Sequence, residues 1–299
     1  MMPKTIDDIE NILVVGAGTL GLRIALRCAL DGYKVKMYDI NPKQLAAAQA
    51  MQTHLINSYL RKGMLTKEMV EQAATGLTVT ADIDEAVTEV DLVSESIIEN
   101  IDVKQAFYAD FAPRLSLGTI LTTNTSYLLP SQLLAQIVEP EKFCALHFHD
   151  VFNQVVVDVM PHPATEQTVI ELLMAFAKRI HQIPVFIKKE HSGYLFNSML
   201  MALIGSAGTL RVNDVGSIQD IDRSFMANFG VQAGPFGMLD QVGLDTALHI
   251  TSARKDNRSI EFSRLLKIYV DQGKLGIKSG EGFYTYPHPE FQHADFLGK

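Results

Sequence analysis

The first part of the chain alternates short apolar runs with longer stretches in which apolar residues recur every three or four positions. Pro42 begins a long helical pattern that continues to about Arg61, and residues 165–180 carry a second one after a threonine cap, Thr165. The short apolar runs predict strands at 12–15, 35–38, 77–79, 92–95, 120–122, 144–147, 155–160 and 185–188. Such alternation predicts an α/β domain built on a parallel sheet.

The rhythm changes at residues 188–191. Strand patterns stop there, and the remaining apolar positions predict helices at 192–210, 218–229, 235–250 and 260–270. We therefore predict two domains, a doubly wound α/β domain over residues 1–188 and an all-α domain over residues 189–299. A chain of 299 residues is long enough to bury both cores.

The first predicted strand runs directly into a glycine-rich turn. Gly16, Gly18 and Gly21 fit the pattern G-x-G-x-x-G between the apolar run 12–15 and a helical stretch. Gly16 permits a tight turn, Gly18 lets the backbone approach a pyrophosphate, and Gly21 lets the helix pack closely on the strand. Asp39 ends the second strand about 20 residues later, where a carboxylate accepts hydrogen bonds from a ribose 2′-hydroxyl. The first domain is therefore predicted to be a Rossmann-type dinucleotide-binding domain.

The surroundings of Asp39 favour NAD over NADP as the cofactor. Its carboxylate would repel a 2′-phosphate, and the residues that follow, Ile40 to Pro42, include no arginine to pair with one. Packing and a helix end would account for Gly21 and Gly32, but not for Asp39. The residues predicted here to contact NAD are Gly16, Gly18, Thr19, Leu20, Gly21, Asp39 and Ile40.

Composition limits the possible partners. A net charge of −8 and a pI near 5.6, without a basic stripe, exclude nucleic acid and an anionic membrane surface as expected partners. No apolar run reaches spanning length, and residues 1–11 do not have the basic and then apolar pattern of a secretory signal, so we expect a cytoplasmic protein. Cys28 and Cys144 are interpreted as small buried side chains rather than as a disulfide or a nucleophile.

Polar residues also end the later predicted strands, on the edge where α/β sheets bind ligands. His147 ends the strand 144–147, where an imidazole exchanges a proton with a substrate hydroxyl near neutral pH. Pairing with the next strand would bring Asp158 to this imidazole and fix its tautomer. Ser126 and Asn197 are candidates to polarise a carbonyl oxygen on which negative charge develops during hydride transfer.

Each of these residues has a structural alternative. His147 would be a satisfied polar residue at a strand end, Ser126 a cap, and Asn197 a buried amide. His147 and His149 share one strand face, and with Asp150 or Asp158 they would offer metal ligands. We expect no metal, because nicotinamide hydride transfer does not need one.

Charged residues cluster at two further places. Glu95, Glu99, Asn100 and Lys104 surround the end of a strand and the start of a helix, where an ordinary helix start and a surface Glu99–Lys104 pair would explain them. The basic residues on and after the long helix form either a solvated face or a site for a phosphate-bearing substrate tail; they are Arg61, Lys62 and Lys67.

Taken together, these segments resemble the L-3-hydroxyacyl-CoA dehydrogenase family, which includes 3-hydroxybutyryl-CoA dehydrogenases, over nearly the whole chain. The similar blocks, in order, are GAGTLG with Asp39, ESIIENIDVK, TTNTSYL, LHF, SGYLFNS with Asn197, GPFGMLDQVGLDT from Gly234 and KSGEGFYTY from Lys278. The resemblance implies an NAD domain, a helical domain that dimerises, a role in fatty acid metabolism, and interconversion of 3-hydroxyacyl-CoA with 3-ketoacyl-CoA.

The resemblance also implies roles for single residues. His147 would be the general base for alcohol oxidation, Ser126 and Asn197 would contact the reacting oxygen, and Asp158 would orient His147. Glu99, Lys104 and Asn124 match family residues near the cofactor, and Lys278 matches a lysine near its nicotinamide end. Asp150 stands at a further position beside the cofactor, where the family has an asparagine.

The sequence departs from the family pattern at the predicted substrate pocket. The family commonly has H-F-F-N-P where this chain has His147 followed by Phe148, His149, Asp150 and Val151. Asp150 thus replaces an asparagine, Tyr127 replaces a small serine, and Asp158 replaces a longer glutamate. A tyrosine and an added negative charge would both reshape the pocket.

Three functions follow from these observations. The first is NAD-dependent oxidation of a short-chain 3-hydroxyacyl-CoA, or the reverse reaction. The second is dehydrogenation of a hydroxy acid or a hydroxylated quaternary amine without coenzyme A, because the charge of Asp150 would suit a cationic substrate. The third is a non-catalytic NAD(H)-binding sensor, against which the presence of Ser126, His147 and Asn197 argues.

Overall fold

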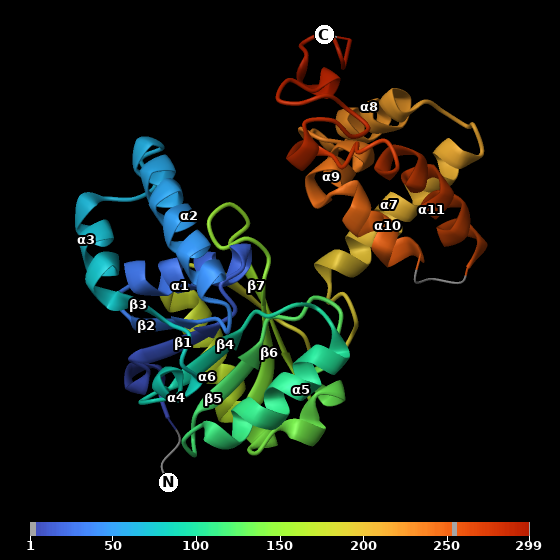
Figure 1. The fold of residues 1–299 in the computed structure, drawn as a ribbon. Coiled ribbons are helices and arrows are strands. Elements are labelled where there is room, and N and C mark those ends of the chain that lie inside the picture. The colour runs from blue at the N-terminus through green and yellow to red at the C-terminus, as the bar shows by residue number, and fades with distance from the viewer. Residues whose placement is uncertain (1–3, 253–255, 299) are drawn as a thin grey trace. The chain divides into compact units, whose positions relative to one another are not determined.

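The computed structural model describes residues 4–252 and 256–298. The chain forms two compact units, Met1–Leu195 and Phe196–Lys299 (Figure 1). Each unit has its own hydrophobic core. The boundary predicted from the sequence, between residues 188 and 189, lies a little before this division. Among the described residues, no helix is both long and apolar enough to cross a membrane.

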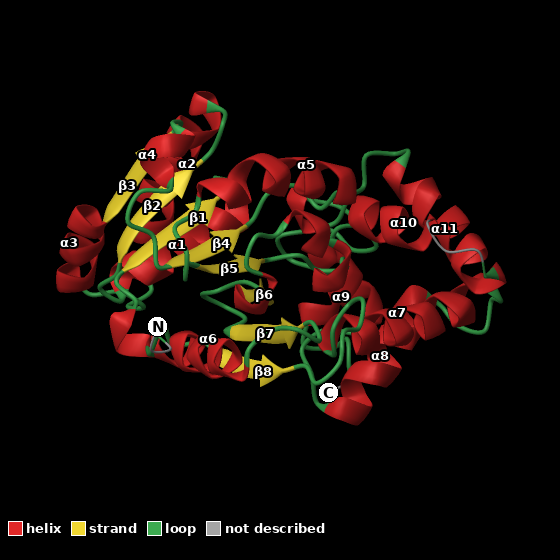
Figure 2. Ribbon diagram, turned by 90° about the horizontal axis from the view of Figure 1, so that it is seen from below, coloured by secondary structure: helices red, strands yellow, loops and turns green. Residues whose placement is uncertain are grey.

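One sheet of eight strands forms the centre of the first unit, in the order β3-β2-β1-β4-β5-β6-β7-β8 (Figure 2). All neighbouring strands are parallel except β6 and β7, which pair antiparallel because residues 149–155 are too few for a crossover helix. All eight predicted strands are present, although the last begins and ends two residues earlier than predicted. Their bounds are β1 Asn11–Val15, β2 Lys34–Tyr38, β3 Leu77–Thr80, β4 Leu92–Glu95, β5 Ile120–Thr123, β6 Phe143–Phe148, β7 Val156–Pro161 and β8 Ile183–Phe186.

Helices cover both faces of this sheet (Figure 1). Ile12 and Val14 of β1 pack into the core on one face, and Leu13 and Val15 pack into the core on the other. This double burial explains why β1 is a continuous apolar run rather than an alternating one, as a doubly wound sheet requires. The helices are α1 Thr19–Leu30, α2 Pro42–Arg61, α3 Lys67–Gly76, α4 Ile83–Ala86, α5 Ile101–Phe111 and α6 Gln167–Arg179.

Two local predictions in this unit have different outcomes. Cys28 and Cys144 are free and buried, as predicted, and burial raises the pKa of both thiols. The predicted threonine cap of α6 is wrong, because Glu166 occupies the N-cap position. The Thr165 hydroxyl instead donates to the carbonyl of Phe143, 2.8 Å away, and so ties the start of α6 to β6.

The second unit is helical, as predicted. The single helix predicted at 235–250 is two helices, because Gly243 adopts a φ of 97° and ends α9. The core contains Phe236, Leu239 and Leu266, each fully buried. The helices are α7 Phe196–Val212, α8 Ile218–Phe229, α9 Pro235–Val242, α10 Leu244–Ser252 and α11 Asn257–Val270.

A buried carboxylate anchors the start of α9. Asp222 of α8 is fully buried and accepts hydrogen bonds from the backbone N–H groups of Phe236 and Gly237, both 2.9 Å away, and from the Tyr284 hydroxyl, 3.0 Å away. A side chain at Gly234 would lie within 2.5 Å of Asp222, so glycine leaves the space that the carboxylate occupies. Burial raises the pKa of Asp222 to about 6.

A second buried carboxylate holds the segment that follows α11. Asp240 is 1% exposed and accepts from the backbone N–H groups of Phe283 and Tyr284, both 2.9 Å away, and from the Tyr286 hydroxyl, 3.1 Å away. A side chain at Gly282 would lie 2.1 Å from Oδ1 of Asp240. Two of the sequence blocks therefore meet at these two aspartates, inside the core of the second unit.

Candidate active site

The glycine-rich turn lies between β1 and α1, and its three glycines have different surroundings. A Cβ at Gly16, whose φ is 96°, would lie 2.6 Å from the carbonyl oxygen of Ser96, and a Cβ at Gly21 would lie 2.0 Å from the carbonyl oxygen of Gly16. A Cβ at Gly18 would meet no atom within 4 Å. Gly18 is the N-cap of α1 and has no side chain, so this residue does not cap the first N–H groups of the helix, those of Thr19 and Leu20.

Asp39 lies directly beside this turn, at the end of β2. Its Oδ2 accepts from the backbone N–H of Ala17 and its Oδ1 from that of Asn41, both at 2.9 Å. The side chain is partly exposed, while the next residue, Ile40, is 82% exposed. A carboxylate fixed at this place, next to free helix N-terminal N–H groups and an open Gly18, fits the ribose and pyrophosphate of NAD.

The carboxyl ends of β5 and β6 and the start of the antiparallel β7 bring a serine, a histidine and an aspartate together. His147 is 5% exposed; its Nε2 lies 3.1 Å from Oγ of Ser126, and its Nδ1 lies 3.0 Å from Oδ2 of Asp158. Because a carboxylate only accepts, Nδ1 carries the proton and Nε2 accepts from the serine hydroxyl. In the antiparallel register of β6 and β7, His147 lies directly opposite Asp158, so strand pairing itself positions the carboxylate.

Asp158 accepts from a second histidine at the same oxygen. Nε2 of His149 lies 2.9 Å from Oδ2 of Asp158. Burial acts to raise the pKa of Asp158, but the hydrogen bonds from His147 and His149 outweigh it and hold this pKa below its ordinary value. The three side chains offer metal-ligand atoms within 4.8 Å of one another, yet the nitrogen–oxygen distances of 2.9 and 3.0 Å are those of hydrogen bonds.

A tyrosine holds the imidazole of His147 from one side. The ring of Tyr194 stacks on that of His147, with centroids 4.7 Å apart and planes 14° apart. The Tyr194 hydroxyl donates to the carbonyl oxygen of Thr125, 2.8 Å away, and burial raises the pKa of this hydroxyl well above its ordinary value. The stack and the hydrogen bond together fix the plane of the imidazole next to Ser126.

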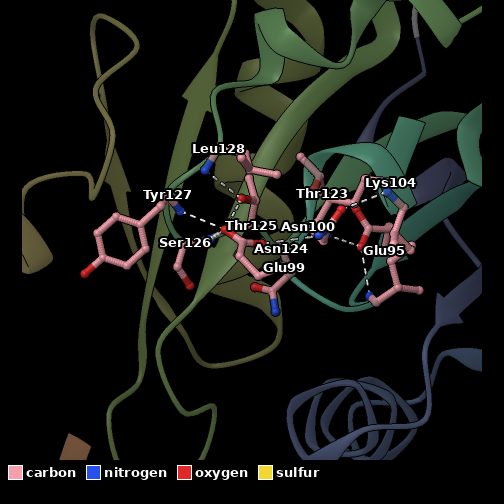
Figure 3. A network of polar contacts seen from close by, with 12 residues as sticks. Glu95, Glu99, Asn100, Lys104, Thr123, Asn124, Thr125, Ser126, Tyr127 and Leu128 are labelled. Atoms are coloured by element: carbon pink, nitrogen blue, oxygen red, sulfur yellow. Dashed lines mark hydrogen bonds and ion pairs between the residues drawn. The ribbon is translucent and has the colours of Figure 1, made fainter. Parts of the chain in front are cut away.

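The loop that carries Ser126 is held by Glu99 (Figure 3). Oε1 of Glu99 accepts from the backbone N–H groups of Ser126 and Tyr127, both at 2.9 Å, and from the Thr125 hydroxyl. Three donors on one carboxylate oxygen fix the direction of the loop, and therefore the direction of the serine hydroxyl toward His147.

To one side of this loop, at the right in Figure 3, lies a buried ion pair between Lys104 and Glu95. Lys104 is 1% exposed and Glu95 is fully buried, so the alternative of a surface pair between Glu99 and Lys104 is wrong. Nζ of Lys104 also lies 3.9 Å from Oε2 of Glu99. Glu95 accepts in addition from three neutral donors at 2.7 to 2.8 Å, the hydroxyls of Tyr108 and Thr123 and the backbone N–H of Ile97. Lys104 is thus connected, through the carboxylate of Glu99, to the loop that carries Ser126.

Two predicted cofactor residues help to shape the ends of the strands. Oδ1 of Asn124 accepts from the backbone N–H of Phe148, 2.7 Å away, and so joins the end of β5 to the end of β6. Asp150 forms an ion pair with Arg23 of α1, and its Oδ1 accepts from the backbone N–H groups of Phe152 and Asn153. Asp150 stands where the family pattern has an asparagine. Because Arg23 pairs with its carboxylate, Asp150 adds no unpaired negative charge to the site.

The other two predicted site residues belong to the second unit. Asn197 is partly buried in the first turn of α7. Nζ of Lys278 lies 2.6 Å from Oδ2 of Asp245, and both side chains are almost half exposed. Their roles at the oxygen of the substrate and near the nicotinamide remain predictions.

The sequence did not reveal two contacts of the site. The stack of Tyr194 on His147 depends on a turn in which Gly193 and Tyr194 have φ of 82° and 51°, and no local pattern marks such a contact. The hydrogen bond from His149 to Asp158 follows from strand alternation, which places His149 on the same face as His147. In the sequence, this shared face indicated only possible metal ligands. Asn100 is the N-cap of α5, which agrees with the alternative that this residue belongs to an ordinary helix start.

The chain matches two family models. The NAD binding domain of 3-hydroxyacyl-CoA dehydrogenase matches residues 11–191, and the C-terminal domain of 3-hydroxyacyl-CoA dehydrogenase matches residues 193–286. The first match coincides with the sheet that carries Gly16, Asp39 and His147, and the second with the helices around Asp222 and Asp240.

Individual relatives agree with these matches. A probable 3-hydroxyacyl-CoA dehydrogenase of Caenorhabditis elegans is 30% identical, over 93% of this chain and 96% of the relative. A fatty acid oxidation complex subunit alpha of Pseudomonas aeruginosa is also 30% identical, but the chain spans only 39% of that subunit. A solved diketoreductase, described as acting on dicarbonyl compounds, is 36% identical with a TM-score of 0.88, over 93% of this chain and 99% of the other. The protein therefore belongs to the 3-hydroxyacyl-CoA dehydrogenase family, whose members are NAD-dependent oxidoreductases that act on CH–OH groups.

Proposed function

We propose that the protein interconverts a short-chain 3-hydroxyacyl-CoA and its 3-ketoacyl form, with His147 as general acid and base. The observation that carries this proposal is the hydrogen-bonded series of Ser126, His147 and Asp158, at the carboxyl ends of β5 and β6 and the start of β7. It lies on the same edge of the sheet as Gly18 and Asp39, which fit the cofactor.

In the oxidative direction, His147 removes the proton of the substrate hydroxyl. Its Nδ1 already donates to Asp158, so Nε2 is the nitrogen that accepts this proton. The imidazolium that forms is stabilised by the ionised carboxylate, whose pKa is held below its ordinary value. Bound NAD supplies the hydride acceptor for the carbon that loses its hydrogen.

The reacting oxygen needs donors as its charge changes. The Ser126 hydroxyl lies 3.1 Å from Nε2 of His147 and is held in direction by Glu99, so it is placed to donate to an oxygen that His147 also contacts. We assign the second donor to Asn197, by its match to the family. The dinucleotide would be held by Gly16, Gly18, Thr19, Leu20, Gly21, Asp39 and Ile40, and the positions proposed next to it are Glu99, Lys104, Asn124, Asp150 and Lys278.

A carbonyl substrate without coenzyme A is a second candidate. The relative described as a diketoreductase is 36% identical to this chain, and the probable 3-hydroxyacyl-CoA dehydrogenase of Caenorhabditis elegans is 30% identical. The segment after His147 also differs from the common pattern of the family. The charge of Asp150 no longer supports a cationic substrate, because Arg23 pairs with it.

The test is NADH oxidation, measured by absorbance, with acetoacetyl-CoA, free acetoacetate, dehydrocarnitine and a small dicarbonyl compound. We expect turnover with the thioester, and a loss of about 10²- to 10⁴-fold in kcat for His147→Gln. His181→Gln replaces a histidine whose side chain is 71% exposed and serves as the matched control. Turnover of only the compounds without coenzyme A would support the second candidate.

The same experiment tests the sensor alternative. A non-catalytic sensor would bind NADH and turn over none of these substrates, and His147→Gln would change nothing. The series Ser126–His147–Asp158 argues against this outcome, because a binding protein has no need of an oriented imidazole.

We further propose a homodimer in the cytoplasm, formed through the second unit. Several large apolar side chains of that unit are exposed within the single chain, among them Met199 at 65%, Val215 at 69% and Phe229 at 71%. Light scattering measures the assembly directly, and a monomeric mass would contradict the proposal.

A further inference from the structure

Strand β6 places two histidines on one carboxylate. The strand direction continues past Phe148, because the backbone N–H of His149 donates to the carbonyl of Val156, 3.2 Å away. Side chains two positions apart point to the same face of a strand, so His149 lies beside His147. Their ring centroids are 5.0 Å apart, and both rings donate to Oδ2 of Asp158.

This carboxylate is withdrawn from water. The side chain of Asp158 is 2% exposed, and those of His147 and His149 are 6% and 8% exposed. A buried carboxylate depends on its hydrogen-bond donors to stay ionised and in one orientation, because no solvent is present to replace them. His149 supplies one of the two imidazole donors, at the shorter distance of the two.

We propose that His149 is a positioning residue, which fixes the carboxylate of Asp158 so that Asp158 orients His147. The inference rests on the proposed role of His147 as general acid and base. An aspartate has a short side chain with few torsions, and donors from two directions leave its oxygen only one favourable place. With the His149 donor removed, the bond to His147 alone of these two holds Oδ2, and the carboxylate sets the tautomer and direction of His147 less firmly.

Two substitutions at position 149 separate hydrogen bonding from packing. His149→Phe keeps a ring of similar size and removes the donor, whereas His149→Gln removes the ring and keeps an N–H donor at similar reach. We expect kcat to fall about tenfold or more in the phenylalanine variant and to stay close to wild type in the glutamine variant. KM for NADH should be unchanged in both, because neither change touches the glycine-rich turn.

Other results would overturn the proposal. If the phenylalanine variant is fully active and the glutamine variant is impaired, the ring packs and does not position. Equal activity in both variants, or an equal loss in both, also contradicts the proposal. Circular dichroism reports whether each variant is folded. If His149→Phe does not fold, His149→Asn replaces it, because its shorter amide does not reach the place of Nε2, and it should lose activity that glutamine retains.

The failure of this inference is distinguishable from failure of the proposed function. Full activity of His147→Gln would refute the general-base role itself, whatever happens at position 149. A strong loss in His147→Gln, together with full activity of His149→Phe, would leave the function standing and refute only the positioning role.

Discussion

Replacing Lys104 by methionine removes the cation that neutralises a fully buried carboxylate. Nζ of Lys104 pairs with Glu95, and the two side chains are 1% and 0% exposed. Removing one partner of a buried ion pair costs about 3–5 kcal/mol, mostly because the remaining charge is left without compensation. Three neutral donors stay on Glu95, including the Tyr108 hydroxyl, so we expect the lower half of this range.

Urea unfolding followed by far-ultraviolet circular dichroism measures this cost, since the chain contains no tryptophan to follow by fluorescence. The transition of the first unit is identified by its shift when NADH is added. Lys267→Met is the matched control, because it removes the lysine of an ion pair with Asp271 in which both partners are more than half exposed. We expect the control to lose less than about 1 kcal/mol.

A double variant tests the reasoning further. In Lys104→Met/Glu95→Gln both charges are gone, and the amide nitrogen can donate to the hydroxyls of Tyr108 and Thr123, which rotate to accept. The double variant should therefore be more stable than Lys104→Met alone. The reasoning is refuted if Lys104→Met costs no more than Lys267→Met, or if Glu95→Gln brings no recovery.

Three further predictions concern the turn, the ribose site and the second unit. Gly18→Ala should leave the stability unchanged, because its Cβ points into open space, and should weaken NADH binding, because that space is where the backbone approaches the pyrophosphate. Gly21→Ala should also destabilise the fold by about 1–3 kcal/mol, because its Cβ would meet the carbonyl oxygen of Gly16. NADH titration measures the binding of each variant, and urea unfolding measures its stability. Asp39→Ser should weaken NADH binding about 10- to 100-fold and reduce the preference of the protein for NADH over NADPH. If the ratio of the dissociation constants for NADPH and NADH is the same in the variant and in wild type, the assignment of Asp39 to the ribose is wrong. The pKa of Asp222, about 6 when folded against 3.8 in the unfolded chain, means that about 3 kcal/mol of stability is present below pH 4 and is lost as the pH rises through 6. Urea unfolding across this range should show a smaller fall for Asp222→Asn than for wild type, and equal falls would refute this.

Most of the fold was predictable from the sequence because the sheet is buried on both faces. A strand buried on both faces, such as β1, is a short continuous apolar run, and such a run is easy to separate from an amphipathic helix. The direction of β7 was not predictable from apolar pattern, which is the same for either direction. The break at Gly243 was missed because the apolar spacing continues through it into α10.

The site was predictable where it depends on strand ends and strand pairing. His147 and Asp158 meet because their strands are neighbours, and alternation also brings His149 to the same face. Contacts between distant segments were not predictable. The pair of Arg23 with Asp150 joins residues 127 positions apart, and the Tyr194 stack depends on a positive φ.

The two buried aspartates of the second unit bear on how relatives of this protein are recognised. The blocks GPFGMLDQVGLDT and KSGEGFYTY contain the glycines, the N–H groups and the tyrosines that surround Asp222 and Asp240. A match to these blocks therefore reports that a chain can build this helical unit, and it carries no information about the imidazole on β6. A descendant that had exchanged His147 and lost all turnover would still match both blocks, so ancestry and activity must be read from different parts of the sequence.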